Sequence, residues 1–418
     1  MMVNVSKLIK RHPFPITGLV VSLLLVVILL SGFWRAGDPT PVAVRVTTDQ
    51  LATSALLSRL TPTIMAEPVQ ESTAAQTTSY IALPITPESA ATPTPESPVP
   101  YIGMWISQAE LAALPVEGPA WDNLMVAAEQ DTDDPEISDQ NDLTDVYVLA
   151  KALVYARTGA LHHREEAIAT IEEAMGSEEG SEALALSRNL VSYIIAADLI
   201  NLPAADPELD GRFQEWLRRL LTEPMSDDRS LRETHEIRPN NFGTHAGASR
   251  VAIALYLEDM DELERAANVF KGWLGDREAY TGFEFGRLDW QADPDNPVGI
   301  NPPGAMKEGI DLSGALPEEM RRSGRFDWPP HNTGYSWEAL QGAIVTAELL
   351  ERAGYPVWEW EQQALLRAVE FLYDIEWPAE GDDEWQPWLI NDAYGTDFPV
   401  TTPARPGKNM GWTDWTHG

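Results

Sequence analysis

The segment from Arg238 to His245 places two amides, Asn240 and Asn241, close to an imidazole. Apolar residues recur at helical spacing over 246–255, so a helix follows at once. Asn240 or Asn241 is expected to cap this helix through its side-chain oxygen. If the helix begins near Asn241, His245 lies one turn later on the same face. An amide and an imidazole facing one space suit an enzyme that acts on a carboxylated sugar; a well-capped helix without chemistry is the alternative interpretation.

A second candidate site is the arginine-rich run at residues 316–325. Arg321, Arg322 and Arg325 lie within five residues. The planar fork of arginine binds a carboxylate through two parallel hydrogen bonds. The alternative is a solvated surface turn in which Glu318 and Glu319 pair with these arginines.

Two further groups of side chains suit sugar recognition. His331 and Asn332 precede Tyr335, which is predicted to begin a helix after a glycine-containing turn. The irregular C-terminal region combines aromatic rings, amides and a cation in Trp388, Asn391, Tyr394, Lys408 and Trp412. Aromatic rings stack on the apolar faces of sugars, so both groups are predicted substrate contacts. A structural tyrosine, and a C-terminal strap that fills the domain with aromatic rings, are the alternatives.

Helices are expected to position these groups. Apolar periodicity predicts about ten of them, near residues 107–114, 121–129, 142–158, 163–175, 183–200, 213–221, 241–257, 262–274, 335–353 and 358–375. Asp142 is expected to cap the third helix and Gly159 to end it. Most connections are short, so neighbouring helices are expected to run antiparallel. The prediction is an all-α fold. Its helical hairpins are expected to curve into an α/α toroid, which is an incomplete ring, and the alternative is an open solenoid. Residues 281–330 and 385–418 are expected to be long ordered loops.

The N-terminal region has a different composition. Residues 1–15 are basic and are predicted to stay in the cytoplasm. Residues 16–34 carry no charge and are long enough to cross a bilayer, as a signal anchor or a cleaved signal peptide. Residues 36–100 are rich in Pro and Thr and are predicted to form a disordered linker. The folded domain, residues 101–418, is therefore expected outside the cytoplasm, membrane-anchored or secreted.

The composition limits the partners and the kinds of site that the chain can have. The net charge of −36 makes nucleic acid an unexpected partner, although a local basic region could still bind an acidic polysaccharide. The chain has no cysteine, which excludes disulfides, thiolate metal sites and a cysteine nucleophile. The histidines lack metal-binding spacings in the sequence, and no phosphate-binding loop or serine elbow is present. We therefore predict neither a metal site nor a cofactor.

At these motifs the chain resembles the alginate lyase family, which are polysaccharide lyases with an α/α toroid fold. The Asn-Asn-His of the family reads Asn240-Asn241-Phe242 here. The family's Asp-Gly-x-Leu-Pro-x-Glu run ending in Arg is matched by residues 313–322, and its Tyr-His-Asn by His331-Asn332 with Tyr335 just after. Residues 411–415, Gly-Trp-Thr-Asp-Trp, are similar to the ending of exported alginate lyase domain proteins. The likeness spans roughly residues 149–418.

The resemblance implies roles for particular residues. Asn241 and Arg322 match the family's pair that neutralises a substrate carboxylate. The family's catalytic His falls on Phe242 and its Tyr on Pro330, so His245 and Tyr335 are the nearest replacements. Arg238, Asn240 and Arg325 are predicted to contact the substrate.

The resulting hypothesis is a lyase that cleaves an alginate-like, uronate-containing polysaccharide by β-elimination. Two alternatives stay open. A toroid glycoside hydrolase would use two carboxylates, for which Asp289, Asp311 and Glu338 are candidates. A membrane-tethered carbohydrate-binding protein without catalysis is the other, motivated by Phe242.

Overall fold

The computed structural model describes residues 103–418. The predictions for the basic segment 1–15, the apolar segment 16–34 and the linker 36–100 fall outside the described residues. Within 103–418, no helix combines the length and the apolar character that a membrane span requires.

The described region is all-α, as predicted, apart from one short hairpin. Its helices are α2 (Gln108–Ala113), α3 (Pro119–Ala128), α4 (Thr144–Thr158), α5 (Leu161–Ala174), α6 (Ala183–Leu199), α7 (Leu202–Ala205), α8 (Pro207–Leu220), α9 (Leu231–Ile237), α10 (Asn241–Tyr256), α11 (Met260–Leu274), α12 (Pro317–Met320), α13 (Tyr335–Arg352), α14 (Trp360–Asp374), α15 (Gln386–Tyr394) and α16 (Thr413–Thr416). Short 3₁₀ turns are η2 (Arg321–Ser323), η3 (Val357–Glu359) and η4 (Gly381–Asp383). Strands β1 (Met306–Lys307) and β2 (Ile310–Asp311) pair antiparallel.

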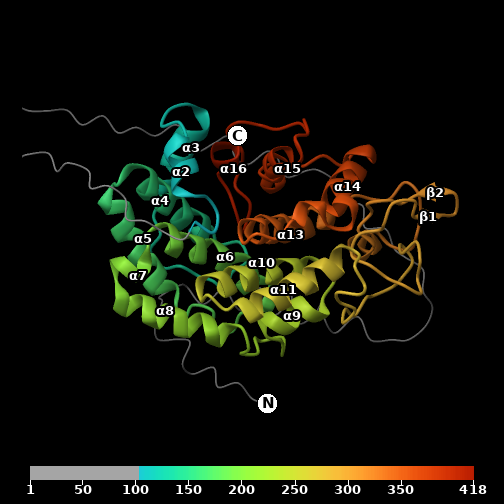
Figure 1. Cartoon of the computed structure of the whole chain (residues 1–418), viewed down its shortest axis with the longest axis horizontal. Coiled ribbons are helices and arrows are strands. Elements are labelled where there is room, and N and C mark those ends of the chain that lie inside the picture. Colours follow the sequence, from blue (N-terminus) through green and yellow to red (C-terminus); the bar gives the residue numbers. More distant parts are fainter. Residues whose placement is uncertain (1–102) are drawn as a thin grey trace, which may run out of the picture. The chain divides into compact units, whose positions relative to one another are not determined.

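Four helices form the buried interior. Nearly every residue of α6 and α10 is buried, and so are most residues of α4 and α13. They pack in sequence, α4 against α6, α6 against α10, and α10 against α13 (Figure 1). A helix that is apolar on all sides must be covered on all sides. The covering helices are α5, α8, α11 and α14, which alternate with the inner ones along the chain and bury only one face each.

Close packing of α10 against α13 depends on Gly342. A Cβ atom at this position would lie 2.4 Å from the backbone nitrogen of His245 and 2.4 Å from the carbonyl carbon of Thr244. The missing side chain therefore allows the first turns of α10 to contact the backbone of α13 directly. This contact fixes the position of Asn241 and His245 relative to Tyr335.

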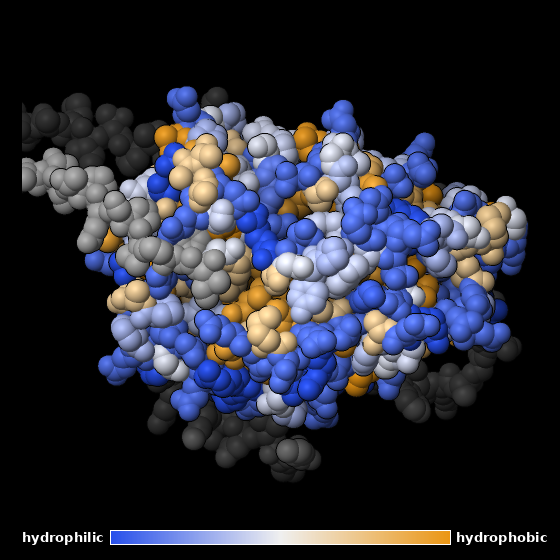
Figure 2. Space-filling model, viewed as in Figure 1, coloured by the Kyte–Doolittle hydropathy of each residue, from blue (hydrophilic) through white to orange (hydrophobic). Residues whose placement is uncertain are grey.

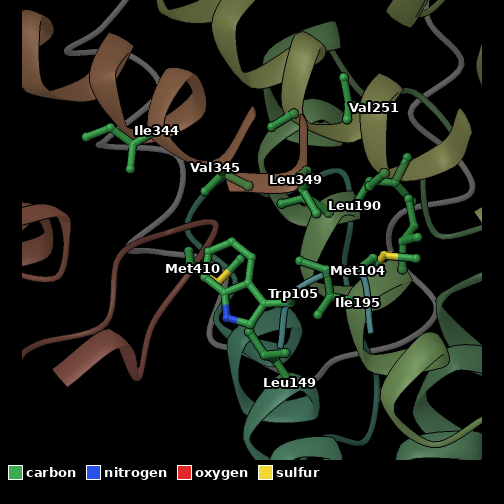
Figure 3. Packing of buried hydrophobic residues seen from close by; sticks show 14 of the residues in the cluster. Met104, Trp105, Leu149, Leu190, Ile195, Val251, Ile344, Val345, Leu349 and Met410 are labelled. Carbon is green, nitrogen blue, oxygen red and sulfur yellow. The ribbon is translucent and has the colours of Figure 1, made fainter. Parts of the chain in front are cut away.

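The C-terminal region connects the last inner helix to the start of the domain. Helix α13 contacts α15, α15 contacts α16, and α16 contacts α3. Trp105, from the beginning of the domain, is fully buried and packs near Met410, Val345 and Leu149 (Figure 3). Burial of one such apolar side chain contributes about 1.5–3 kcal/mol. The two ends of the described region thus share one core. The molecular surface on the face shown in Figure 2 is mainly hydrophilic.

Helix positions were predicted well, and helix ends less well. All ten predicted helices are present, and Gly159 ends α4 in the left-handed conformation with φ 75°. Helix α4 begins at Thr144 and has no side-chain cap, because Asp142 instead accepts hydrogen bonds from the backbone and hydroxyl of Thr144. Sequence periodicity did not predict α7, α9, α12, α15 or α16, and the last two of these lie in the predicted irregular region 385–418.

Candidate active site

Helix α9 and the turn after it set the position of Asn241. Ser230 and Glu233 form a capping box at the start of α9, which ends at Ile237 and is followed by Arg238. The chain then reverses closely into α10. A Cβ atom at Gly243 would lie 1.7 Å from the carbonyl oxygen of Arg238, so glycine is required at this approach. The Arg238 guanidinium lies over the ring of Phe242, 5.4 Å from its centroid.

The cap of α10 differs from the prediction. Neither asparagine caps the helix: the side chain of Asn240 makes no capping bond, and its buried Oδ1 has no hydrogen-bond partner. Instead, the carboxylate of Glu319 accepts a hydrogen bond of 2.6 Å from the backbone N–H of Asn241. The Asn241 side chain is therefore left for other contacts.

Arg322 joins three separate segments of the chain. Its Nη2 donates a hydrogen bond of 3.4 Å to Oδ1 of Asn241, and its Nε lies 3.7 Å from Oε2 of Glu319. Its guanidinium also stacks over the Tyr335 ring, 4.0 Å from the centroid. The structure thus brings together Asn241, Arg322 and Tyr335, three of the four predicted catalytic residues. The side chain of Arg322 is 26 % exposed, so it faces solvent from this position.

A network of charged side chains lies beside Arg322 and Tyr335. Arg188 from α6 pairs with Glu338 from α13. Lys408 lies 3.7 Å from Glu338 and 3.8 Å from Asp382. Tyr335 and Glu338 lie three positions apart in the first turn of α13, so their side chains share one face of the helix. We call these residues, with Asn241, Glu319, Arg322 and Tyr335, the central polar cluster.

Burial changes the protonation of two carboxyl groups near the cluster. Burial raises the pKa of Glu319 to about 7, although the nearby Arg322 opposes the shift. Burial likewise raises the pKa of Asp383 to about 7 against hydrogen bonds from Gln341. A neutral Glu319 leaves the positive charge of Arg322 uncompensated, so that Arg322 attracts an incoming anion more strongly.

His245 lies one turn after Asn241, as predicted, but it is fully buried. Neither ring nitrogen has a hydrogen-bond partner. Burial, with the nearby charges of Arg188 and Lys408, lowers the pKa of His245 well below its usual value. The imidazole is therefore neutral, and it lies behind the cluster rather than at its exposed side.

Three other predicted substrate contacts are exposed. Arg325 lies in the loop after η2, and His331 and Asn332 lie in the loop before α13. Asn332 accepts a hydrogen bond of 2.9 Å from the backbone of Gly334, which shapes the turn into Tyr335. Within residues 103–418, no hydrogen bond or ion pair joins these three residues to the central polar cluster.

Four predicted sugar-binding residues of the C-terminal region have structural contacts instead. Trp412 is 2 % exposed and donates from its indole to the carbonyl of Val146, so neither ring face is free for a sugar. Asn391 holds the loop 396–398 through three hydrogen bonds. The hydroxyl of Tyr394 donates to Trp358, and the indole of Trp388 donates to Thr401. Of the five candidates in this region, Lys408 alone joins the central polar cluster.

Sequence inspection missed several members of the cluster. The sequence indicates Glu319 only as a surface partner of the arginines, yet it is 1 % exposed and caps α10. Arg188 lies in the apolar pattern of α6, and a charge at a buried helical position is a signal that could have identified it. Glu338 was considered as a hydrolase carboxylate, but it pairs with Arg188, whereas Asp289 and Asp311 contact Arg287 and Ser313.

Comparison with known proteins identifies the family of the chain. The family model for alginate lyase matches residues 147–282 and 302–385, more than half of the chain. The matched ranges include Asn241, Arg322 and Tyr335, while Lys408 lies beyond them. No curated protein and no solved structure matches the chain. The family match shows that this chain belongs to the alginate lyase family.

Proposed function

We propose that the protein is a polysaccharide lyase that cleaves a uronate-containing, alginate-like polysaccharide by β-elimination. The observation that carries this proposal is the position of Arg322, which contacts Asn241 at 3.4 Å and the ring of Tyr335 at 4.0 Å. The sequential packing of α4, α6, α10 and α13 under alternating outer helices supports an incomplete α/α toroid as the fold.

In this proposal, Asn241 and Arg322 bind the carboxylate of the uronate. The proton on C5 is a very weak acid while the neighbouring carboxylate keeps its full charge. Donors that neutralise this carboxylate stabilise the enolate-like intermediate, and such electrostatic stabilisation is usually the largest contribution to catalysis. The Asn241 amide is available because Glu319 caps the helix in its place.

Tyr335 transfers the proton. Its oxygen removes the C5 proton as phenolate, the C4–O bond to the next sugar breaks, and a C4–C5 double bond forms. The same phenol then returns a proton to the departing glycosidic oxygen. Tyr335 is 36 % exposed, so a substrate can reach its hydroxyl, and the guanidinium of Arg322 lies 4.0 Å from its ring centroid.

His245 is the other candidate for the proton acceptor, and we assign it a supporting position. Its ring is neutral and could accept a proton, but it is fully buried, whereas Tyr335 reaches solvent. Substrate contacts are proposed for Arg238, Asn240, Arg325, His331, Asn332 and Lys408.

We also propose that residues 16–34 tether the domain to a membrane, with the polysaccharide outside the cytoplasm. The support is the uncharged run at 16–34 after a basic segment.

The test is to incubate the purified full-length chain with alginate and with other polyuronates. We expect the ultraviolet absorbance of an unsaturated uronate to appear with at least one of them. Tyr335→Phe should lower kcat at least about 100-fold, because general acid–base groups contribute this much or more. His245→Gln should retain most of the activity.

Matched controls separate chemistry from folding. Tyr355→Phe removes a hydroxyl from a half-buried tyrosine outside the cluster, and it should act like the wild type. A folded protein that gives no unsaturated product from any polyuronate contradicts the proposal. Reducing ends without the ultraviolet signal would indicate a hydrolase, and binding without turnover a carbohydrate-binding protein.

A further inference from the structure

Two helices on the outside of the domain bring three metal-ligating side chains together. Glu129 is the residue that ends α3, and His162 and His163 lie in the first turn of α5. Nε2 of His163 lies 3.7 Å from Oε1 of Glu129, and the two imidazole rings are 3.9 Å apart between centroids. One donor atom from each of the three side chains lies within 4.8 Å of the others.

The buried member of this group lacks partners of its own. His163 is 1 % exposed, yet its Nδ1 has no hydrogen-bond partner. The other ring nitrogen of His163, Nε2, lies 3.7 Å from the Glu129 carboxylate, which is too long for a hydrogen bond. A buried polar ring without a satisfied partner is costly.

The surroundings favour a cation. A hollow of about 340 Å³ beside the group is lined by five carboxylates, those of Glu129, Asp131, Asp133, Glu166 and Glu173. The single ammonium group in this lining, Lys151, is already held by Glu166 at 2.6 Å and by the carbonyl of Ala128 at 2.9 Å. The side chains that line this hollow therefore carry a net negative charge, which favours a cation beside the two imidazoles.

We propose that Glu129, His162 and His163 bind a divalent first-row transition metal ion, with Zn²⁺ as the best match. Two imidazole nitrogens and one carboxylate oxygen are a common zinc ligand set, and water would fill the remaining position of a tetrahedron. Mg²⁺ and Ca²⁺ prefer sites made entirely of oxygen ligands. The metal joins the end of α3 to the start of α5, so its effect is on the stability of this pair of helices and it is independent of the proposed lyase chemistry.

Sequence spacing alone predicted no metal site, because His162 and His163 are adjacent and Glu129 lies far from them in the chain. The packing of both α3 and α5 against α4 is what brings Glu129 to the two histidines.

The experiment measures zinc binding by the full-length chain after dialysis against a chelator. A chromophoric zinc indicator competes for the metal, and thermal unfolding is followed with and without ZnCl₂. We expect one ion per chain with a raised Tm. Glu129→Gln and His163→Gln should each weaken binding at least about tenfold. The matched control, Glu165→Gln, removes one exposed carboxylate from the same helix and should bind zinc like the wild type.

His162→Gln provides a second test, because His162 is exposed and its loss should not prevent folding. Zinc binding that stays unchanged in the ligand variants overturns the proposal, as does a wild-type chain that binds no zinc. An equal rise in Tm with MgCl₂ alone also overturns it, since the site would then be a general cation surface.

Discussion

At the scale of single residues, the candidate site depends on the different hydrogen bonds that Glu319 and Asn241 make. Glu319 binds the first N–H of α10, and Asn241 keeps its side-chain oxygen for Arg322. If Asn241 capped its own helix, the amide would be occupied. The carboxylate therefore stabilises the helix and also frees the amide for a substrate.

The raised pKa of Glu319 gives a prediction for stability against pH. The raised pKa keeps a proton on Glu319 up to about pH 7 in the folded protein, whereas the pKa of a free glutamate is 4.5. The stabilisation of the folded state that protonated Glu319 contributes is fully present below the pKa of the free group. It is lost as the pH rises through the pKa of Glu319 in the folded protein. The contribution is on the order of 3 kcal/mol. Asp383 acts in the same direction.

The measurement is the Tm at about pH 5 and about pH 8. Glu319→Gln keeps the size and the hydrogen-bond acceptor but cannot ionise, so the fall in Tm between these values should become smaller. Glu165→Gln should keep the wild-type fall. A slope that is the same in Glu319→Gln as in the wild type would show that Glu319 is ionised in the folded state throughout this range.

At the scale of elements, the site depends on how closely α10 and α13 approach each other. Gly342 on α13 lies against the backbone of Thr244 and His245. The first residue of α13 is Tyr335, and the first residue of α10 is Asn241. A shift between these two helices would therefore move the proposed proton-transfer group away from the proposed carboxylate-binding group.

Gly342→Ala tests this contact. The added methyl group would lie 2.4 Å from backbone atoms, so the helices must separate. We expect a loss of at least about 2 kcal/mol in the free energy of unfolding, measured in urea. Gly211→Ala on α8 meets no atom within 4 Å and should stabilise the protein by about 0.5–1 kcal/mol, as alanine does in a helix. Equal stability of Gly342→Ala and the wild type would mean that α13 adjusts without strain.

At the scale of the whole molecule, the net negative charge and the long uncharged apolar run lie in different parts of the chain. Acidic and basic residues balance in residues 1–102, so the net charge of −36 belongs to residues 103–418. The proposed site is a local exception, because Arg188, Arg322 and Lys408 gather there. Screening over about 8 Å at physiological salt lets such a group bind an anion despite the surrounding charge.

The proposed tether gives the prediction at this scale. The full-length chain should sediment with membranes and need detergent for release, whereas a chain that begins at residue 36 should stay in the supernatant. Protease added to intact cells without an outer barrier should digest the domain only if it lies outside the cytoplasm. Full-length protein in the supernatant before detergent, with residues 1–35 still present, would contradict the tether.

The sequence by itself determined the helices and several candidate residues, because apolar periodicity and glycine or serine signals act over a few neighbouring positions. The ten predicted helices and the candidates Asn241, Arg322 and Tyr335 came from such local patterns and from the family resemblance. Only the tertiary structure decided which side chains meet. Arg322 and Asn241 are 81 positions apart, and Arg188 and Glu338 are 150 apart. Their contacts depend on the packing of α6, α10 and α13, which no short window of sequence encodes. The same packing buries Trp412, which looked suited to sugar binding, and places Glu129 beside two adjacent histidines.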